Sequence, residues 1–256
     1  AGGGVGGDAG AAIDEEWGRT MAERANVTRR LKRLANVGVR LVMPHTIHLD
    51  ATVRVAAGAT LYGGCVLLGQ TRIDAGAVIH AGAWLRDTDV GRDTVIKPYA
   101  VLDGATVGAD SAVGPLAHLR PGAVLERDVK VGNFVEVKKS TLHDGVRASH
   151  LTYLGDSEVG EGANIGAGTI TCNYDGVAKY RTEIGAGAFV GSNSALVAPV
   201  RIGEGVIVGA GSTISRDIPD RALAVERGQS KVIEDKAPAL WARNRERARR
   251  KRDDDG

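Results

Sequence analysis

Aromatic side chains are scarce in this sequence. Only ten of its 256 residues are aromatic: two Phe, five Tyr and three Trp. A globular core of this size normally uses more aromatic bulk. Glycine is plentiful at 36 residues, roughly double the usual share. The glycines follow no every-third-residue pattern, which excludes collagen, and 43 % hydrophobic residues with a net charge of +2 exclude wholesale disorder. We therefore expect an ordered chain of tight corners and small or β-branched side chains.

Cysteine and long apolar runs are also rare. Cys65 and Cys172 lie far apart and form no Cys-x-x-Cys pair, which excludes a disulfide framework and a zinc ribbon. No apolar run approaches the roughly 18 residues that a membrane span needs. We expect a reduced, cytoplasmic protein without a membrane partner. The chain begins with Ala and a Gly-rich stretch instead of Met, so we expect a fragment whose natural N-terminus lies upstream.

Basic residues are concentrated near the C-terminus. Seven lie between Arg243 and Arg252, against the single acid Glu246, and three Asp follow. A basic tail can bind nucleic acid, but this one has no interleaved aromatics and ends in acids. We favour a solvated helix end or tail, and we predict no nucleic-acid partner.

An aliphatic or small residue recurs with a period of six along most of the chain. Four steps are five residues long (85 to 90, 102 to 107, 137 to 142 and 154 to 159), and the 171–184 step holds an insertion. The 28 positions are Leu49, Val55, Leu61, Leu67, Ile73, Ile79, Leu85, Val90, Ile96, Leu102, Val107, Val113, Leu119, Leu125, Val131, Val137, Leu142, Ala148, Leu154, Val159, Ile165, Thr171, Ile184, Val190, Leu196, Ile202, Val208 and Ile214.

A period of six fits neither a 3.6-residue helix nor a simple alternating strand. It is typical of a short strand followed by a tight corner, with glycine supplying the positive φ that such corners need. Three units close a triangular coil, so 28 units predict about nine coils, and the narrow interior explains the shortage of aromatics. We predict an all-β chain. Hexapeptide-repeat chains of this kind form the left-handed parallel β-helix, and the handedness comes from that resemblance alone.

The segments around the repeat differ from it in pattern. We expect a disordered Gly-rich tail at 1–12 and a helical linker at 13–44. The β-helix domain is predicted at 45–219, with an inserted loop at 171–184. A C-terminal helical arm and charged tail are predicted at 220–256, where Pro238 lies near the first turn of the arm.

Four motifs of unusual polar density lie in the second half of the repeat. They are Arg120-Pro-Gly-Ala, Gly132-Asn-Phe-Val-Glu-Val-Lys-Lys, His150-Leu-Thr-Tyr-Leu-Gly-Asp and Asn164-Ile-Gly-Ala-Gly-Thr-Ile-Thr-Cys-Asn-Tyr-Asp-Gly. In this order and spacing they resemble the acetyltransferase domain of the bacterial bifunctional N-acetylglucosamine-1-phosphate uridyltransferase/glucosamine-1-phosphate acetyltransferase. The resemblance extends from about residue 26 to about 230 and is dense from 113 to 216.

The resemblance implies transfer of the acetyl group of acetyl-CoA, as co-substrate, to the 2-amino group of glucosamine 1-phosphate. The product, N-acetylglucosamine 1-phosphate, serves UDP-N-acetylglucosamine and cell-wall precursor synthesis. His150 matches the general base, which suits an amine that must lose a proton, because histidine titrates near neutrality. The family works as a homotrimer with sites between subunits. The remaining matched residues are Arg120, Lys138, Tyr153 and Asn164 for the sugar phosphate, and Asn173, Tyr174, Ser192, Ala210 and Arg227 for acetyl-CoA.

Other interpretations of these residues compete with this one. His45-x-x-His48, or His143 with His150, could suggest zinc, but a third ligand in a matching position is missing. We predict no metal, which also argues against the hexapeptide-fold carbonic anhydrases. Two alternatives stay open: a hexapeptide acyltransferase acting on another amino sugar, and a non-catalytic hexapeptide scaffold. The Gly-rich signature of the family's nucleotidyltransferase domain does not occur here, so uridylyl transfer is not predicted for this chain.

Overall fold

The structure is a computed structural model that describes residues 7–228 and 232–254. It divides into two compact units, Ala1–Glu226 and Arg227–Gly256. The first unit contains helix α1 (Gly7–Asn36), one short 3-10 turn η1 (Pro44–Thr46) and every strand described below; the second contains helix α2 (Lys236–Asp254). Among the described residues, neither helix combines the length and apolar character needed to cross a bilayer.

Thirty short strands wind through three parallel sheets. Sheet A has eleven strands. They are β1 (Arg40–Val42), β4 (Thr60–Tyr62), β7 (Val78–Ile79), β10 (Val95–Ile96), β13 (Ala112–Val113), β16 (Lys130–Asn133), β19 (Arg147–His150), β22 (Asn164–Ile165), β25 (Phe189–Val190), β28 (Ile207–Val208) and β30 (Leu223–Ala224).

Sheet B has ten strands. They are β2 (His48–Leu49), β5 (Val66–Leu68), β8 (Trp84–Arg86), β11 (Val101–Asp103), β14 (His118–Leu119), β17 (Glu136–Lys138), β20 (Tyr153–Gly155), β23 (Ile170–Cys172), β26 (Ala195–Val197) and β29 (Thr213–Ile214).

Sheet C has nine strands. They are β3 (Arg54–Val55), β6 (Arg72–Ile73), β9 (Asp89–Val90), β12 (Thr106–Val107), β15 (Val124–Leu125), β18 (Thr141–Leu142), β21 (Ser157–Val159), β24 (Thr182–Ile184) and β27 (Val200–Ile202).

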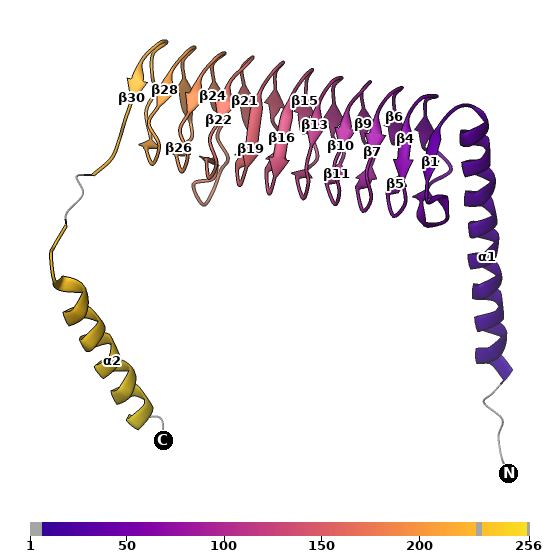
Figure 1. Ribbon diagram of the computed structural model, residues 1–256, viewed down its shortest axis with the longest axis horizontal. Helices are drawn as coiled ribbons and strands as arrows, with labels where there is room; N and C mark the ends of the chain where they lie inside the picture. Colours follow the sequence, from indigo (N-terminus) through magenta and orange to yellow (C-terminus); the bar gives the residue numbers. More distant parts are fainter. Residues whose placement is uncertain (1–6, 229–231, 255–256) are drawn as a thin grey trace. The chain divides into compact units, whose positions relative to one another are not determined.

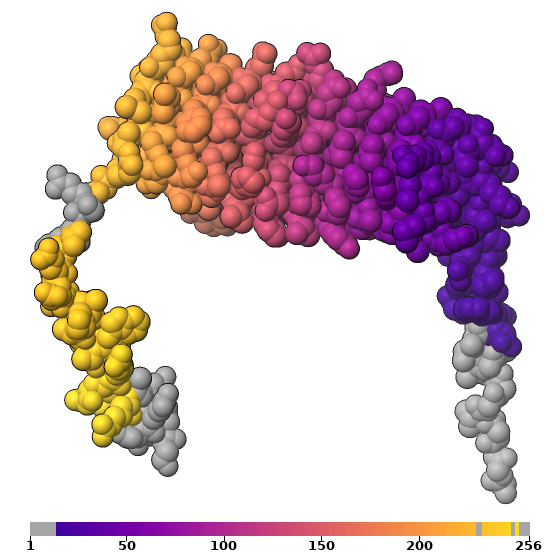
Figure 2. Space-filling model, in the orientation of Figure 1, coloured from indigo at the N-terminus to yellow at the C-terminus, as the bar shows by residue number. Residues whose placement is uncertain are grey.

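The chain visits the sheets in the order A, B, C and then returns to A one coil further on, as Figure 1 shows for the stacked strands. We call the turn from sheet A to B the first corner, from B to C the second corner, and from C to A the third corner. Thirty strands make about ten coils, and the body of the coil is continuously packed along its length (Figure 2).

The interior of the coil is formed by the residues that the six-residue period identifies. All 28 predicted positions lie on strands β2 to β29, and residues such as Leu61, Leu85 and Leu154 are completely buried. Each fully buried aliphatic side chain contributes about 1.5–3 kcal/mol. The two extra strands, β1 and β30, account for ten coils where the repeat predicted about nine. They escaped the repeat because η1 separates β1 from β2, and because the step from Ile214 to Ala224 is not six residues.

The helical segments also begin and end at other residues than the sequence predicts. Residues 1–6 of the predicted disordered tail lie outside the described residues, whereas residues 7–12 form the first turns of α1, where Ala9, Ala11 and Ala12 favour helix. The predicted linker at 13–44 includes β1, which pairs with β4, so strand pairing starts before residue 45. It also continues past residue 219, because β30 pairs with β28.

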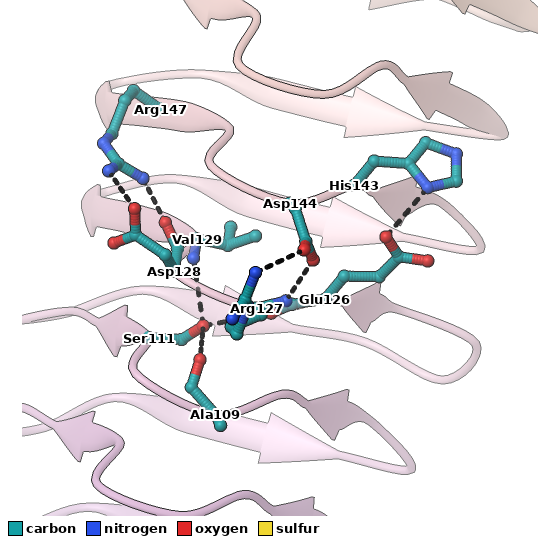
Figure 3. A network of polar contacts seen from close by, with 9 residues as sticks. All are labelled: Ala109, Ser111, Glu126, Arg127, Asp128, Val129, His143, Asp144 and Arg147. Atoms are coloured by element: carbon teal, nitrogen blue, oxygen red, sulfur yellow. Dashed lines mark hydrogen bonds and ion pairs between the residues drawn. The ribbon is translucent and has the colours of Figure 1, made fainter.

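Side-chain hydrogen bonds link consecutive coils at the third corner and nearby (Figure 3). The buried Ser111 hydroxyl accepts the Val129 N–H at 3.0 Å, one coil further on. Asp128 binds the Arg147 guanidinium at 2.7 Å, again between neighbouring coils. Such contacts fix the register of each coil on the next, so a residue's place in the repeat sets its place on the surface.

Along the 28 predicted positions, length changes occur only at the second corner, whereas η1 lengthens the first corner between β1 and β2. All four five-residue steps run from sheet B to sheet C, and so does the 171–184 insertion between β23 and β24. Along the 28 predicted positions, the first and third corners keep the six-residue step throughout. The insertion therefore adds a loop without shifting the strands on either side.

Candidate functional site

Three of the candidate residues lie on successive strands of sheet B. Arg120 directly follows β14, Lys138 ends β17, and Tyr153 begins β20. In the register of the sheet, Glu136 lies opposite Tyr153 and Lys138 opposite Gly155. The regular stacking of coils thus places Arg120 and Lys138 one above the other at the edge of sheet B nearest the second corner.

Positive charge gathers at this edge. The Arg120 guanidinium donates to Glu136 at 2.8 Å, and this partner raises the pKa of Arg120. Lys179, on the inserted loop, lowers the pKa of Lys138 through its close approach, and partial desolvation and the charge of Arg120 act in the same direction. Glu136 already pairs with Arg120, and the charge of Asp156 opposes the lowering of the Lys138 pKa. A phosphate dianion would offset the repulsion that remains between Lys138 and Lys179.

The first residues of the inserted loop reach back to sheet B. The side-chain amide of Asn173, which is buried, donates to the Asp156 carboxylate at 2.5 Å and to the Tyr153 hydroxyl at 3.5 Å. Gly155 makes room for this contact, because a β-carbon there would collide with the Tyr153 hydroxyl and the Asn173 amide. The Thr171 hydroxyl, in an inward position, accepts the Gly155 N–H at 2.8 Å. The start of the loop is therefore firmly held.

The loop itself is a small hairpin. Tyr174 and Lys179 form an antiparallel bridge, and the Tyr174 hydroxyl donates to the Gly176 carbonyl at 2.6 Å. The Asp175 carboxylate accepts the N–H groups of Ala178 and Val177, which lowers the pKa of Asp175. Hydrogen bonding to that carboxylate raises the pKa of the Tyr180 hydroxyl. The hairpin is pre-organised, while the side chain of Tyr174 remains exposed.

His150 lies at the first corner, on the last position of β19, with its side chain exposed to solvent. Its Nδ1 atom lies 2.7 Å from the Asn133 side-chain oxygen, on the coil before. Asn133 and His150 are register partners in sheet A. An exposed imidazole held through one nitrogen can act through the other.

Two of the acetyl-CoA candidates lie on the same corner as His150. The register of sheet A places Ser192 two coils after His150, and Ala210 one coil further. Both are exposed. At about 4.8 Å per coil, Ser192 is roughly 10 Å from His150 along the corner, so the three residues form one line.

The structure does not bring every candidate residue together. Asn164 begins β22 and pairs with Arg147, three residues before His150, on the outer face of sheet A. Arg227 is exposed and belongs to the second compact unit, so its candidate role stays a prediction.

The inserted loop and the second corner enclose a polar hollow of about 440 Å³. It is lined by Gly122, Lys139, Ser140, Thr141, Asp156, Ser157, Lys179, Tyr180 and Arg181. A larger hollow of about 630 Å³ lies between α1 and the first coils, and none of the candidate residues lines it. Within residues 7–228 and 232–254, no group of three or more His, Cys, Asp or Glu is arranged to hold a metal ion.

Two residues with apparent roles were missing from the sequence-based set. Lys179 lies on the insertion that the sequence singled out, and only the hairpin shows that it reaches Lys138. Asn133 lies in one of the recognised motifs, yet its contact with His150 depends on a register 17 residues apart.

Comparison with known proteins supports the hexapeptide interpretation. The family model "Bacterial transferase hexapeptide (six repeats)" matches residues 181–216. This match and the three parallel sheets confirm the fold as a left-handed parallel β-helix of hexapeptide repeats.

Relatives with much higher coverage of this chain are named "Bifunctional protein GlmU". The protein of Nitratidesulfovibrio vulgaris strain DP4 is 55 % identical over 192 residues, 75 % of this chain and 42 % of the relative. The protein of Thermus thermophilus is 54 % identical over 197 residues, which cover 77 % of this chain and 44 % of the relative. The protein of Sorangium cellulosum is 45 % identical over 238 residues, which cover 93 % of this chain and 50 % of the relative. The chain therefore spans about half the length of these relatives, and the resemblance drawn from its motifs is confirmed.

Proposed function

We propose that this chain, a relative of the bifunctional proteins named GlmU, is a glucosamine-1-phosphate N-acetyltransferase. It transfers the acetyl group of acetyl-CoA to the 2-amino group of glucosamine 1-phosphate and forms N-acetylglucosamine 1-phosphate. The observation that carries the proposal is an exposed imidazole and a cluster of three cations on neighbouring coils, in a chain 55 % identical to such a relative.

The chemistry requires a base beside an amine. The sugar nitrogen attacks the thioester carbonyl carbon of acetyl-CoA, so that an N–C bond forms and the C–S bond breaks. His150 takes the proton that the nitrogen loses, and the departing CoA thiolate is protonated to the thiol. Histidine suits this step because it is largely neutral, and hence basic, near pH 7.

The cation cluster would bind the 1-phosphate of the sugar. Arg120 offers a planar fork for two phosphate oxygens, and Lys138 and Lys179 act as point charges. Phosphate binding would relieve the repulsion that lowers the pKa of Lys138. Tyr153 and Asn164 are proposed as further contacts of the sugar phosphate.

Acetyl-CoA would run along the first corner. Asn173 and Tyr174, on the hairpin, would line the acetyl group and the amine, and Ser192 and Ala210 would follow the cofactor along the line of coils. Ser192 could steady the thioester carbonyl, and Arg227 could pair with phosphates of CoA. The proposals for Ser192 and Ala210 are supported by their position in the repeat, whereas those for Asn173, Tyr174 and Arg227 rest on the resemblance of the sequence.

The active assembly is proposed to be a homotrimer with sites in the grooves between subunits. Within one chain, His150, Ser192 and Ala210 lie at the first corner, whereas Asn173, Tyr174 and the three cations lie at the second corner and the edge of sheet B beside it. A second subunit facing the first corner would enclose the residues that lie there. The cytoplasmic location remains a prediction.

A thiol-release assay tests the substrate assignment. Acetyl-CoA is supplied with glucosamine 1-phosphate, glucosamine 6-phosphate or glucosamine, and we expect turnover to be strongest with the 1-phosphate. Equal activity on all three, or activity on another acceptor only, would replace the assignment with another amino-sugar acyltransferase. No activity on any acceptor would favour a scaffold. Sedimentation as a monomer at micromolar concentration would contradict the shared site.

A further inference from the structure

We infer that Asn133 is a positioning residue for the reaction. Its side-chain oxygen holds His150 in the tautomer that carries hydrogen on Nδ1 and leaves the lone pair on Nε2. This inference rests on the proposed function for its catalytic consequence. The hydrogen bond and the tautomer can be tested without it.

The backbone around the two residues is built to keep them together. Strands β16 and β19 are four residues long, whereas the other strands of the described chain have two or three. Their pairing extends to Asn133 and His150, at the very edge of the first corner. The next amide, Leu151 N–H, donates to the Asn133 carbonyl at 3.0 Å. The two side chains are thus held one coil apart by hydrogen bonds on the backbone itself.

Gly132 makes this close pairing possible. A β-carbon at position 132 would collide with the carbonyl oxygen of Ser149, which directly precedes His150. With glycine there, the two strands stay close enough for the Asn133 oxygen to lie 2.7 Å from Nδ1. In the described chain, this is the one hydrogen bond made by the His150 side chain.

The chemistry of an amide oxygen fixes the proton. A carbonyl oxygen only accepts, so Nδ1 must be the donor, and a neutral imidazole then has its lone pair on Nε2. After His150 takes the substrate proton, the same Nδ1–H remains bound, so the imidazole keeps its orientation throughout the step. An amide is uncharged, and it therefore orients the ring without adding the attraction for the imidazolium that a carboxylate would add.

The charged residues on the two strands, Arg147 and Lys130, make no described contact with the imidazole. Arg147, three residues before His150 on β19, binds Asp128 at 2.7 Å. Lys130 is its register partner on β16 and is exposed. The Asn133 oxygen is the group placed to select its tautomer.

The test uses two substitutions of Asn133 with opposite consequences. Asn133→Leu removes the acceptor at similar size, and Asn133→Asp keeps an acceptor but adds charge. Lys130→Gln, three residues earlier on the same strand, is the matched control. With histidine labelled by ¹⁵N and the His150 signal assigned by its loss in His150→Gln, the wild-type protein is expected to show hydrogen on Nδ1 of neutral His150. Asn133→Leu is expected to show mainly the Nε2–H form, and Lys130→Gln the wild-type form.

The kinetic expectations follow the same logic. Asn133→Leu should lower kcat about tenfold or more with little change in KM. A His150 side chain with hydrogen on Nε2 cannot accept the substrate proton there, whereas the residues that bind the substrate are unchanged. Asn133→Asp should keep the tautomer and move the acidic limb of the kcat/KM profile to higher pH. Lys130→Gln should match the wild type.

The outcomes separate this inference from the proposed function. A wild-type signal with hydrogen on Nε2 overturns the inference, and so does an Asn133→Leu protein with unchanged tautomer and kcat. Wild-type protein with no acetyltransferase activity overturns the proposed function, while the spectrum still decides the tautomer. If Asn133→Leu fails to fold, the wild-type spectrum together with Asn133→Asp decides.

Discussion

The early coils, residues 40–119, and the central coils, residues 120–197, share an aliphatic interior, except at the inward Thr171, and have different exteriors. Both regions bury aliphatic residues at the inward position, and Leu85 and Leu154 are both completely buried. At the first corner, however, the same repeat position holds Pro98 and Pro115 in the early coils and Asn133 and His150 in the central ones. The inward residues thus determine the coil, and the chemistry depends on the outward residues, whose identity the repeat does not constrain.

A second contrast appears at the edge of sheet B nearest the second corner. Arg86 in the early coils is paired with Asp103 at 2.5 Å and lies over the Trp84 ring. Arg120 and Lys138 occupy the same position two and three coils later, where Lys179 joins them. Arg120 pairs with Glu136 as Arg86 pairs with Asp103. The two regions therefore differ in Lys138 and Lys179, whose approach to each other suits an anionic ligand.

The largest expected effect is at the first corner of the central coils. His150→Ala should reduce turnover by about 10²–10⁴-fold, as expected for loss of a general base, while the circular dichroism of the coil stays unchanged. Steady-state kinetics with acetyl-CoA and glucosamine 1-phosphate measure this. Full turnover in the variant would show that His150 is not the base, and it would contradict the chemical difference proposed between the two regions.

Substitutions in the interior should affect both regions alike. Leu85→Ala and Leu154→Ala should each lower the free energy of unfolding by about 2–5 kcal/mol, since both side chains are fully buried and each leaves a cavity. Urea denaturation compares the two variants. A large loss in one region and none in the other would show that the interiors are not equivalent.

Matched substitutions on sheet B should separate binding from surface charge. Arg120→Gln should raise KM for the sugar phosphate about tenfold with kcat nearly unchanged, because a hydrogen bond to a charged group is among the stronger polar contacts. Arg86→Gln, at the same position of an early coil, should leave both constants unchanged and barely move the urea midpoint, because exposed ion pairs contribute little to stability. Equal effects of the two on KM would contradict a localised phosphate site.

The smallest expected effect is confined to the hairpin. The pKa of Asp175 is lowered by the Ala178 and Val177 amides, so the carboxylate stabilises the hairpin above its ordinary pKa of about 3.9. This contribution is lost as the pH falls through the lowered value. An NMR titration below about pH 4 should shift these two amides before those of the early coils, and Asp175→Asn should abolish the step. A uniform response along the chain would argue against a separately held loop.

Much of the fold follows directly from the sequence. A period of six with aliphatic residues such as Leu61 predicts every strand from β2 to β29, because a narrow coil tolerates little else at inward positions. The outermost strands did not follow, since β1 is separated from the repeat by the 3-10 turn at Pro44–Thr46. The helix at residues 7–12 did not follow either, because the glycines there suggest disorder while the alanines between them favour helix.

The site was predicted less completely. Motifs identify His150, Arg120 and Lys138 as single residues, but pairings such as Asn133 with His150 depend on the length of each coil. The influence of Lys179 on the pKa of Lys138 depends on how the hairpin folds back, and the hydrogen bonds around Asp175 hold that hairpin. Periodicity does not report either arrangement.

Along the 28 predicted positions, the confinement of length changes to the second corner has a practical consequence. Because the 171–184 insertion leaves the following strands in register, the second corner accepts added residues without disturbing the sheets. A peptide grafted at the second corner of an early coil, for instance between Arg86 and Asp89, would be displayed on a rigid rod at a chosen height, about 4.8 Å for each coil.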